Sequence, residues 1–230
     1  MVYETVTDLD QLLDRIRSYH ADADLGLVRK AYEFSAKAHE GQIRRSGEPY
    51  LRHPIAVAGV LSSLKTDVTA IVAALLHDTL EDTVATPDEL EREFGKDVVH
   101  LVDGVTKIGK ITFRSYEEKQ AENFRKMVLS MADDIRVVLI KLADRLHNMR
   151  TVEYWGRQKQ VQKARETLDV YGPLAHRLGI HKLKWELEDL SFEALHPRKY
   201  AEIKAMVAER RADREEHVNE AKVALQHELD

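Results

Sequence analysis

The 230-residue sequence contains no cysteine, and this absence excludes several kinds of site at once. No disulfide framework, thiolate metal site or cysteine nucleophile can be built from it. Any metal that the chain binds must take its ligands from histidine, carboxylate or amide side chains. The 11 histidines and 40 acidic residues of the sequence offer many such ligands.

The sequence also lacks a long hydrophobic segment. Its wholly apolar runs reach about seven residues, whereas a helix that crosses a bilayer needs about 20. The N-terminal residues MVYETVTDLD show no basic region followed by a long apolar one, as a signal peptide would. We therefore expect a cytoplasmic protein without a membrane partner. The net charge of −5 argues against broad adhesion to nucleic acid, so none is expected as a partner of this domain.

Strand patterns hardly appear, because period-two alternation never persists beyond a few residues. Helical spacing recurs instead, and 43% apolar residues suffice for a sizeable core. The sequence thus predicts an all-α protein, a helical bundle with a charged C-terminal helical extension. A short hairpin is expected near GKITFRS (109–115), and a helix from Ser115 to about Ala132.

Start and stop signals place several of these helices. In TPDELEREFG (86–95), Thr86 is a typical cap, Pro87 opens the helix and Gly95 ends it. Other helices are expected over 25–38, 54–64 and from 134 onward. Gly172-Pro173 is expected to break a helix, and Pro197 to close another.

One strongly apolar helix ends in charged residues. Ala70–Leu76 is apolar on every side, which is typical of a buried helix, yet His77, Asp78, Glu81 and Asp82 follow within six residues. Burying an unpaired carboxylate costs several kcal/mol. We therefore expect these acids to have a partner, either a metal, another cation or a proton.

Two other segments supply side chains of the same kind. His53 stands just ahead of a helix, and Asp144 lies inside an apolar helix within KLADRLHNMRT. With His77 and Asp78 they offer two imidazoles and two carboxylates, a set suited to Mn²⁺, Fe²⁺ or Zn²⁺. Each residue alone has a simpler interpretation, such as a surface histidine. Their combination favours a metal site.

Four motifs in order resemble the hydrolase (HD) domain of the RelA/SpoT homologue family, which controls the alarmone (p)ppGpp. They are HEGQIRRSGEPYLRHP (39–54), AALLHDTLEDT (73–83), VDGVTKI (102–108) and IKLADRLHNMRT (140–151). The resemblance runs from about residue 25 to residue 195. It implies a Mn²⁺-dependent hydrolase of the stringent response that removes the 3′-pyrophosphate from ppGpp or pppGpp, releasing GDP or GTP.

The resemblance also implies a role for each matching residue. The metal ligands would be His53, His77, Asp78 and Asp144, and the catalytic acids would be Glu81 and Asp82. The substrate-binding residues would be Arg44, Arg45, Ser46, Lys141, Asn148 and Thr151. Many relatives have lysine at the position of Arg45, a difference that keeps the positive charge.

Two other functions remain open on the sequence. The domain could be an HD phosphohydrolase for another nucleotide or a phosphodiester, or a catalytically silent regulatory HD module. The charged residues after Pro197 suggest an N-terminal fragment of a long bifunctional synthetase/hydrolase. Residues 1–196 would form the hydrolase domain, and 197–230 a helical linker toward a synthetase domain. Any association of the parent protein with the ribosome would involve regions outside this sequence.

Overall fold

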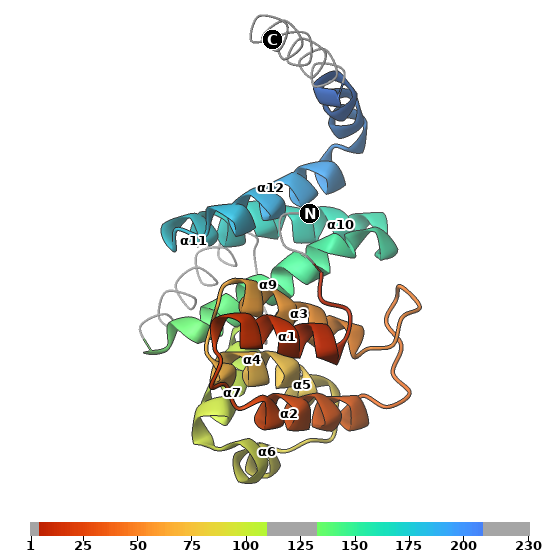
Figure 1. Cartoon of the computed structure of the whole chain (residues 1–230). Coiled ribbons are helices and arrows are strands. Elements are labelled where there is room, and N and C mark those ends of the chain that lie inside the picture. The colour runs from red at the N-terminus through yellow and green to blue at the C-terminus, as the bar shows by residue number, and fades with distance from the viewer. Residues whose placement is uncertain (1–4, 110–132, 209–230) are drawn as a thin grey trace, which may run out of the picture.

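The computed structural model describes residues 5–109 and 133–208, and within these ranges the chain forms helices and no strand (Figure 1). The first range contains α1 (Leu9–Tyr19), α2 (Leu25–Ala38), α3 (Arg52–Ser63), α4 (Val68–Leu76), α5 (Thr79–Asp82), α6 (Pro87–Phe94) and α7 (Lys96–Gly109). The second contains α9 (Ile135–Arg150), the 3-10 turn η1 (Val152–Tyr154), α10 (Arg157–Glu166), the π-helical segment η2 (Thr167–Tyr171), α11 (Gly172–Arg177) and α12 (His181–Leu195). A further helix spans 197–208.

The all-α prediction is confirmed. The hairpin expected near 109–115 and the helix expected from Ser115 fall outside the described residues, apart from Gly109, which ends α7.

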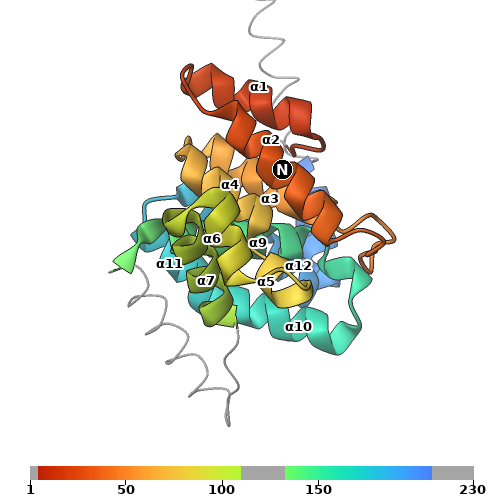
Figure 2. The same cartoon turned by 90° about the horizontal axis from the view of Figure 1, so that it is seen from below.

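The helices form two layers, and α9 lies between them (Figure 1). On one side α9 contacts α3, α4 and α7 of the N-terminal layer, and on the other side it contacts α12. Figure 2 shows α2, α3 and α7 around α4 in the N-terminal layer. The helix over 197–208 extends away from both layers, and its residues 201–208 are exposed (Figure 1).

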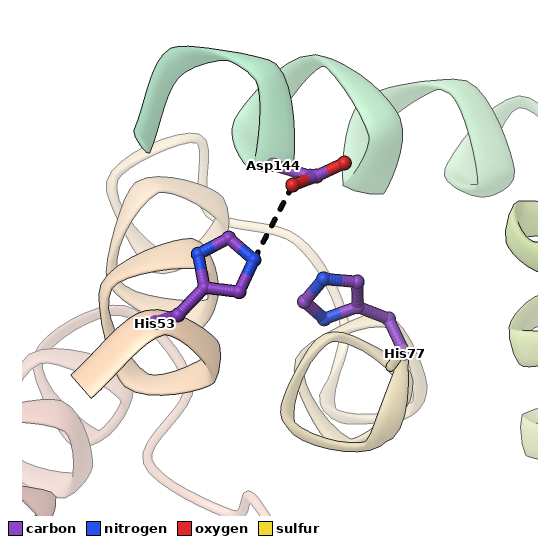
Figure 3. A group of neighbouring side chains, drawn as sticks. All are labelled: His53, His77 and Asp144. Carbon is purple, nitrogen blue, oxygen red and sulfur yellow. Dashed lines mark ion pairs between the residues drawn. The ribbon is translucent and has the colours of Figure 1, made fainter. Parts of the chain in front are cut away.

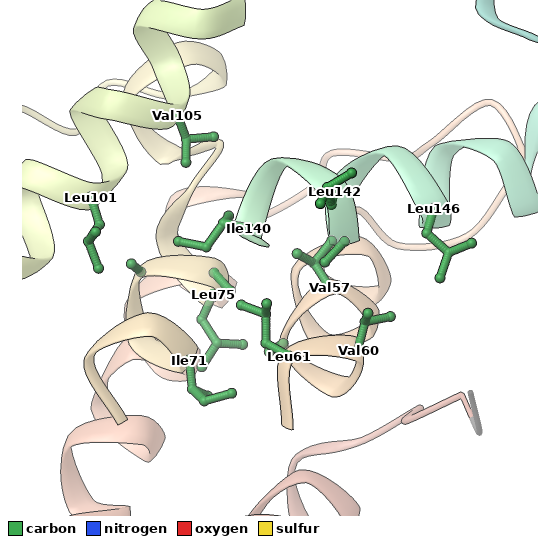
Figure 4. Close-up of a cluster of buried hydrophobic side chains, with 14 of the residues drawn as sticks. Val57, Val60, Leu61, Ile71, Leu75, Leu101, Val105, Ile140, Leu142 and Leu146 are labelled. Atoms are coloured by element: carbon green, nitrogen blue, oxygen red, sulfur yellow. The ribbon is translucent and has the colours of Figure 1, made fainter. Parts of the chain in front are cut away.

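Helix α4 lies at the centre of the core. Every residue of Ala70–Leu76 is buried, as expected for a helix that is apolar on all sides. Branched aliphatic side chains of α3, α7 and α9 belong to the same core as α4, and each contributes about 1.5–3 kcal/mol when fully buried. Figure 4 shows them: Val57, Val60 and Leu61, then Leu101 and Val105, then Ile140, Leu142 and Leu146. This packing holds α3, α4 and α9 in fixed relation.

Helix α6 begins and ends where its sequence signals predict. The Thr86 hydroxyl accepts a hydrogen bond from the backbone N–H of Glu89 at 3.3 Å, and Pro87 is the first helical residue. Gly95 follows the last turn with a φ of 85°, a left-handed value that favours glycine.

The prediction of a helix break at Gly172-Pro173 is wrong. The chain stays helical from α10 to α11, because η2 adopts the wider π-helical turn. The N–H of Gly172 bonds to the carbonyl of Thr167, five residues earlier. A proline ring clashes with the carbonyl four residues before it in a regular helix, and the wider turn relieves that clash. Pro197, in contrast, follows the end of α12 as expected.

Candidate active site

Three helices bring predicted metal ligands together. His53 comes from the first turn of α3, His77 from the end of α4 and Asp144 from the middle of α9, and their side chains point toward one another (Figure 3). All three are buried, and one ligand atom of each lies within 4.8 Å of the others. Nε2 of His53 is 3.3 Å from Oδ1 of Asp144. Residues more than 90 positions apart in the chain thus form one compact cluster.

Asp78 borders the same cluster. Its Oδ2 lies 3.4 Å from His53 Nε2, and its Oδ1 lies 3.0 Å from His77 Nε2. Because α4 ends at Leu76, His77 and Asp78 occupy the turn before α5, where two adjacent side chains can face one point. The structure therefore brings all four predicted ligands together. Their role in binding an ion stays a prediction.

The donor set fits a divalent cation. Nδ1 of His77 bonds to the carbonyl oxygen of Ala74 at 2.8 Å, and since a carbonyl only accepts, Nδ1 carries the hydrogen. Nε2 of a neutral His77 then has a free lone pair. This atom is buried and has no hydrogen-bond partner, since its contact with Asp78 is not aligned as a hydrogen bond. A buried nitrogen without a partner is costly, and a cation would satisfy it.

The charges of the cluster also suit a cation. Burial opposes a charge on His77, but Asp78 and Asp144 outweigh it and raise the pKa of His77 to about 9, so without an ion Nε2 carries a proton at neutral pH, and a cation would take the place of that proton. Burial likewise opposes the charge of both acids. His77 beside Asp78, and Lys141 beside Asp144, nevertheless hold the pKa of each carboxyl well below its usual range. Both carboxylates are therefore ionised at neutral pH and attract a positive ion.

The cluster opens into a cavity of about 380 Å³, a volume typical of small-molecule sites. The predicted catalytic acids line this cavity, as do four of the predicted substrate-binding residues: Glu81 and Asp82, then Arg44, Arg45, Lys141 and Asn148. Ser46 and Thr151 do not line it. The Ser46 hydroxyl bonds to Glu48 within its loop, and the Thr151 hydroxyl bonds to the carbonyl of His147 at the end of α9.

The loop between α2 and α3 is joined to α9 across the cavity. Nη2 of Arg44 donates to Oδ1 of Asn148 at 3.1 Å, and Nδ2 of Asn148 donates to Oδ1 of Asp144 at 2.5 Å. The other oxygen of Asp144 pairs with Nζ of Lys141 at 2.9 Å. Asp144 thus makes an ion pair with Lys141 and also faces His53. The Arg45 guanidinium lies over the ring of Trp155, 4.8 Å from its centre.

Sequence reasoning missed several polar side chains of the site, including Arg145, which lines the cavity. The Tyr50 hydroxyl lies 2.9 Å from Oδ2 of Asp78 and 2.6 Å from Oδ2 of Asp82. Nδ1 of His147 lies 2.9 Å from Nδ1 of His53, and Lys163 of α10 lines the cavity. His147 stands three residues after Asp144, so helical spacing could have revealed it. No sequence pattern indicated Lys163, because its helix belongs to the other layer.

An all-helical bundle around a buried cluster of histidines and aspartates is the arrangement of a metal-dependent HD domain. Residues 31–181 match the HD domain family. The match covers more than half of the chain, which therefore belongs to this family. HD domains are metal-dependent, and the cluster of His53, His77 and Asp144 provides a candidate metal site.

Two curated relatives are similar to this chain over most of its length. The chain is 52% identical over 209 residues to the bifunctional (p)ppGpp synthase/hydrolase SpoT of Escherichia coli K12, covering 91% of this chain and 30% of that protein. It is 54% identical over 208 residues to a GTP pyrophosphokinase of Myxococcus xanthus, covering 89% of this chain and 28% of that protein. The chain spans less than a third of the length of these relatives. The resemblance drawn from the four motifs is confirmed.

A solved structure agrees with these relatives. It is described as a metazoan ortholog of SpoT that hydrolyzes ppGpp. It matches with a TM-score of 0.55 and 29% identity, over 75% of this chain and 95% of that one. Among the described residues, no helix has both the length and the apolar character needed to cross a membrane.

Proposed function

We propose that this HD domain is a (p)ppGpp 3′-pyrophosphohydrolase, which releases pyrophosphate and GDP or GTP. The observation that carries the proposal is the cluster of His53, His77 and Asp144, which meets a cavity with arginines and lysines on its other walls. A cation site beside fixed positive charges suits a substrate with adjacent phosphates.

The comparisons favour hydrolysis over synthesis for this part of the relatives. Some relatives are named for synthesis and others for hydrolysis. The metazoan structure bears on the difference, because this chain covers 95% of it. A solved chain no longer than the proposed domain therefore has a description that states ppGpp hydrolysis. A silent module is disfavoured, because every predicted metal ligand and catalytic acid is present.

The metal would be held by His53, His77, Asp78 and Asp144. When bound, a divalent ion lowers the pKa of a water molecule and screens the charge of a phosphate. We assign Mn²⁺ through the family resemblance. Imidazole and carboxylate together also suit Fe²⁺ and Zn²⁺, so activity with each ion in turn tests this assignment.

The remaining side chains would position the substrate and move protons. Glu81 and Asp82 are exposed carboxylates at the cavity, where one can accept a proton from the attacking water and the other can serve the departing ribose oxygen. Arg44 and Arg45 can pair with phosphate through two N–H groups or lie flat on a purine. Ser46 would contact only those parts of a nucleotide that extend beyond the cavity lining.

Asn148 lines the cavity and would face the ribose, and Lys141 would add positive charge close to the phosphates. Thr151, which caps α9, would contact the nucleotide only beyond the lining.

The test is release of pyrophosphate from ppGpp in the presence of Mn²⁺. We expect turnover by the wild type and a loss of about 100-fold or more in Asp78→Asn and Glu81→Gln. Glu93→Gln is the matched control, because Glu93 is remote from the cluster and pairs with Lys30. Turnover of another nucleotide but not of ppGpp would indicate a different HD phosphohydrolase. No turnover of any substrate in a panel would indicate the silent module.

We also propose that residues 1–196 form the hydrolase domain and that 197–230 lead toward a synthetase domain in a longer cytoplasmic protein. The greater length of the relatives supports this proposal. Any ribosome association would belong to regions beyond this chain.

A further inference from the structure

We propose that His147 is a positioning residue that fixes the tautomer of His53. In this proposal His147 accepts a hydrogen bond from Nδ1–H of His53, so that Nε2 of His53 presents its lone pair to the metal cluster. The two Nδ1 atoms lie 2.9 Å apart, and both side chains are buried. The inference rests on the metal-binding role proposed for His53, but not on the identity of the substrate.

The direction of this hydrogen bond follows from Arg44. A bond between two imidazole nitrogens needs a hydrogen on one and a lone pair on the other, and an isolated pair could adopt either order. Nη1 of Arg44 lies 3.5 Å from the same Nδ1 of His147. A guanidinium only donates, so a hydrogen on His147 Nδ1 would face another donor. His147 Nδ1 is therefore the acceptor, and His53 Nδ1 carries the hydrogen.

The consequence appears on the other side of the His53 ring. A neutral imidazole has one N–H, so a hydrogen on Nδ1 leaves the lone pair on Nε2. Nε2 is the atom that lies 3.3 Å from Asp144 and 3.4 Å from Asp78, two carboxylates that can accept a hydrogen from Nε2 until a cation takes the place of that hydrogen. The opposite tautomer would place a hydrogen where a cation would bind. A metal-binding histidine usually donates its second N–H to a carboxylate or carbonyl, and here a second histidine takes that place.

Arg44 also fixes the orientation of Asn148, which bonds to Asp144 of the cluster. Because its Nη2 donates to Oδ1 of Asn148 at 3.1 Å, the amide nitrogen of Asn148 is the group left to donate to Asp144, at 2.5 Å. His147 and Asn148 are neighbours in α9. Each contacts Arg44 on one side and a predicted metal ligand on the other, His53 for His147 and Asp144 for Asn148. The Asn148 path donates from Arg44 to Asp144, whereas on the His147 path Arg44 and His53 both donate toward Nδ1 of His147.

Two variants of His147 separate hydrogen bonding from packing. His147→Asn places an amide oxygen close to the position of Nδ1, whereas His147→Leu has the same branching and no acceptor. Mn²⁺ alone is titrated into each protein, and the free ion is measured by electron paramagnetic resonance. We expect His147→Leu to bind Mn²⁺ about 10–100-fold more weakly than the wild type. His147→Asn should retain an affinity close to that of the wild type.

Thermal melting without metal shows whether both variants fold, and His176→Leu, an exposed histidine of α11, is the control for a lost imidazole. Equal loss of Mn²⁺ affinity in His147→Asn and His147→Leu would overturn the proposal in favour of packing.

Nuclear magnetic resonance of ¹⁵N-labelled histidines reads the tautomers directly. In protein loaded with diamagnetic Zn²⁺, we expect His147 to carry its hydrogen on Nε2 and His53 to carry its hydrogen on Nδ1. A hydrogen on Nδ1 of His147 would overturn the inference. An inactive wild type with the expected tautomers and Mn²⁺ affinities would contradict the proposed function alone, so the two failures are distinguishable.

Discussion

At the residue scale, the Tyr50 hydroxyl holds two acids of different proposed roles. It lies within hydrogen-bonding distance of Asp78, a predicted metal ligand, and of Asp82, a predicted catalytic acid. One phenol has a single hydrogen, so the two carboxylates share one donor. The ring is held in place by stacking on His39, with the ring centres 4.3 Å apart. Tyr50 therefore sets the spacing between the metal cluster and the catalytic acid.

Tyr50→Phe removes this donor and leaves the stacked ring. We expect kcat/KM for ppGpp hydrolysis to fall by about 10–100-fold, the usual effect of losing a hydrogen bond to a metal ligand. Tyr200→Phe is a matched control, since the Tyr200 hydroxyl makes a similar 2.9 Å bond to the exposed Asp189. Equal activity of both variants in steady-state assays would show that Tyr50 has no such role.

Lys163 makes the cavity sensitive to pH. The charge of Arg145, together with burial, lowers the pKa of Lys163 to about 8. A lysine is charged below its pKa, so the cavity loses a positive charge as the pH rises through about 8. We expect kcat/KM for the anionic substrate to fall over this range, because that ratio reports ionisations of the free enzyme.

Lys163→Arg should keep its charge throughout and flatten this part of the profile. A fall of the same size in Lys163→Arg would assign the pH dependence to another group. The folded-state pKa lies below the ordinary value of 10.5, so this residue should also make the fold more stable as the pH rises from about 8 to 10.5.

Residue type and spacing predicted the cluster better than its surroundings. His53, His77, Asp78 and Asp144 could be found because ionisable groups within apolar helices are rare. Tyr50 and Lys163 are ordinary residues in a loop and on a polar helix. Their importance arises only from tertiary contacts that no local pattern encodes.

At the scale of elements, a buried ion pair joins α9 to α12. Nη2 of Arg150 lies 2.7 Å from Oε1 of Glu186, and both side chains are less than 10% exposed. Glu186→Leu removes the carboxylate and leaves a buried guanidinium charge. We expect the free energy of unfolding to fall by about 3–5 kcal/mol. Lys184→Gln, which breaks a more exposed pair with Glu188 on the same helix, should cost less than about 1 kcal/mol.

Urea unfolding of both variants measures this difference. Similar stabilities for Glu186→Leu and Lys184→Gln would show that the buried pair does not hold the two layers together.

Helix ends were predictable where a side chain or a special backbone angle marks them. Thr86 and Gly95 bound α6 as expected, because capping and left-handed geometry depend on single residues. The π-helical segment was not predictable. Its wider turn depends on how α10 and α11 pack on α12 as well as on Pro173.

At the scale of the whole molecule, one bound ion would link α3 and α4 of the N-terminal layer to α9. A ligand that binds only the folded state raises the free energy of unfolding by about 2.7 kcal/mol at 100 times its dissociation constant. We expect Mn²⁺ at that excess to raise the melting temperature of the wild type, and EDTA to reverse the gain. Asp144→Asn should show little or no gain. A shift of equal size in this variant would place the stabilising ion elsewhere.

The proposed domain boundary predicts that the chain after residue 196 is dispensable for folding. Residues 201–208 are exposed, and Tyr200 contacts α12 only near its end. A protein that stops at residue 196 should melt within about 4 °C of the full chain and keep its activity. Loss of cooperative melting would move the boundary toward the C-terminus. The layered arrangement itself could not be predicted, since helix spacing does not specify which faces meet.

The π-helical turn of η2 places Tyr171 so that its hydroxyl accepts a hydrogen bond from Nη2 of Arg145 at 2.9 Å. Removing any one residue of Thr167–Tyr171 would restore regular winding and rotate the following chain by about 100°. Regular winding would also restore the clash of the Pro173 ring with the preceding turn. Tyr171 would no longer reach Arg145, and Arg145 lines the cavity. Single-residue length changes at this point therefore affect both the continuity of the helix and the chemistry of the cavity.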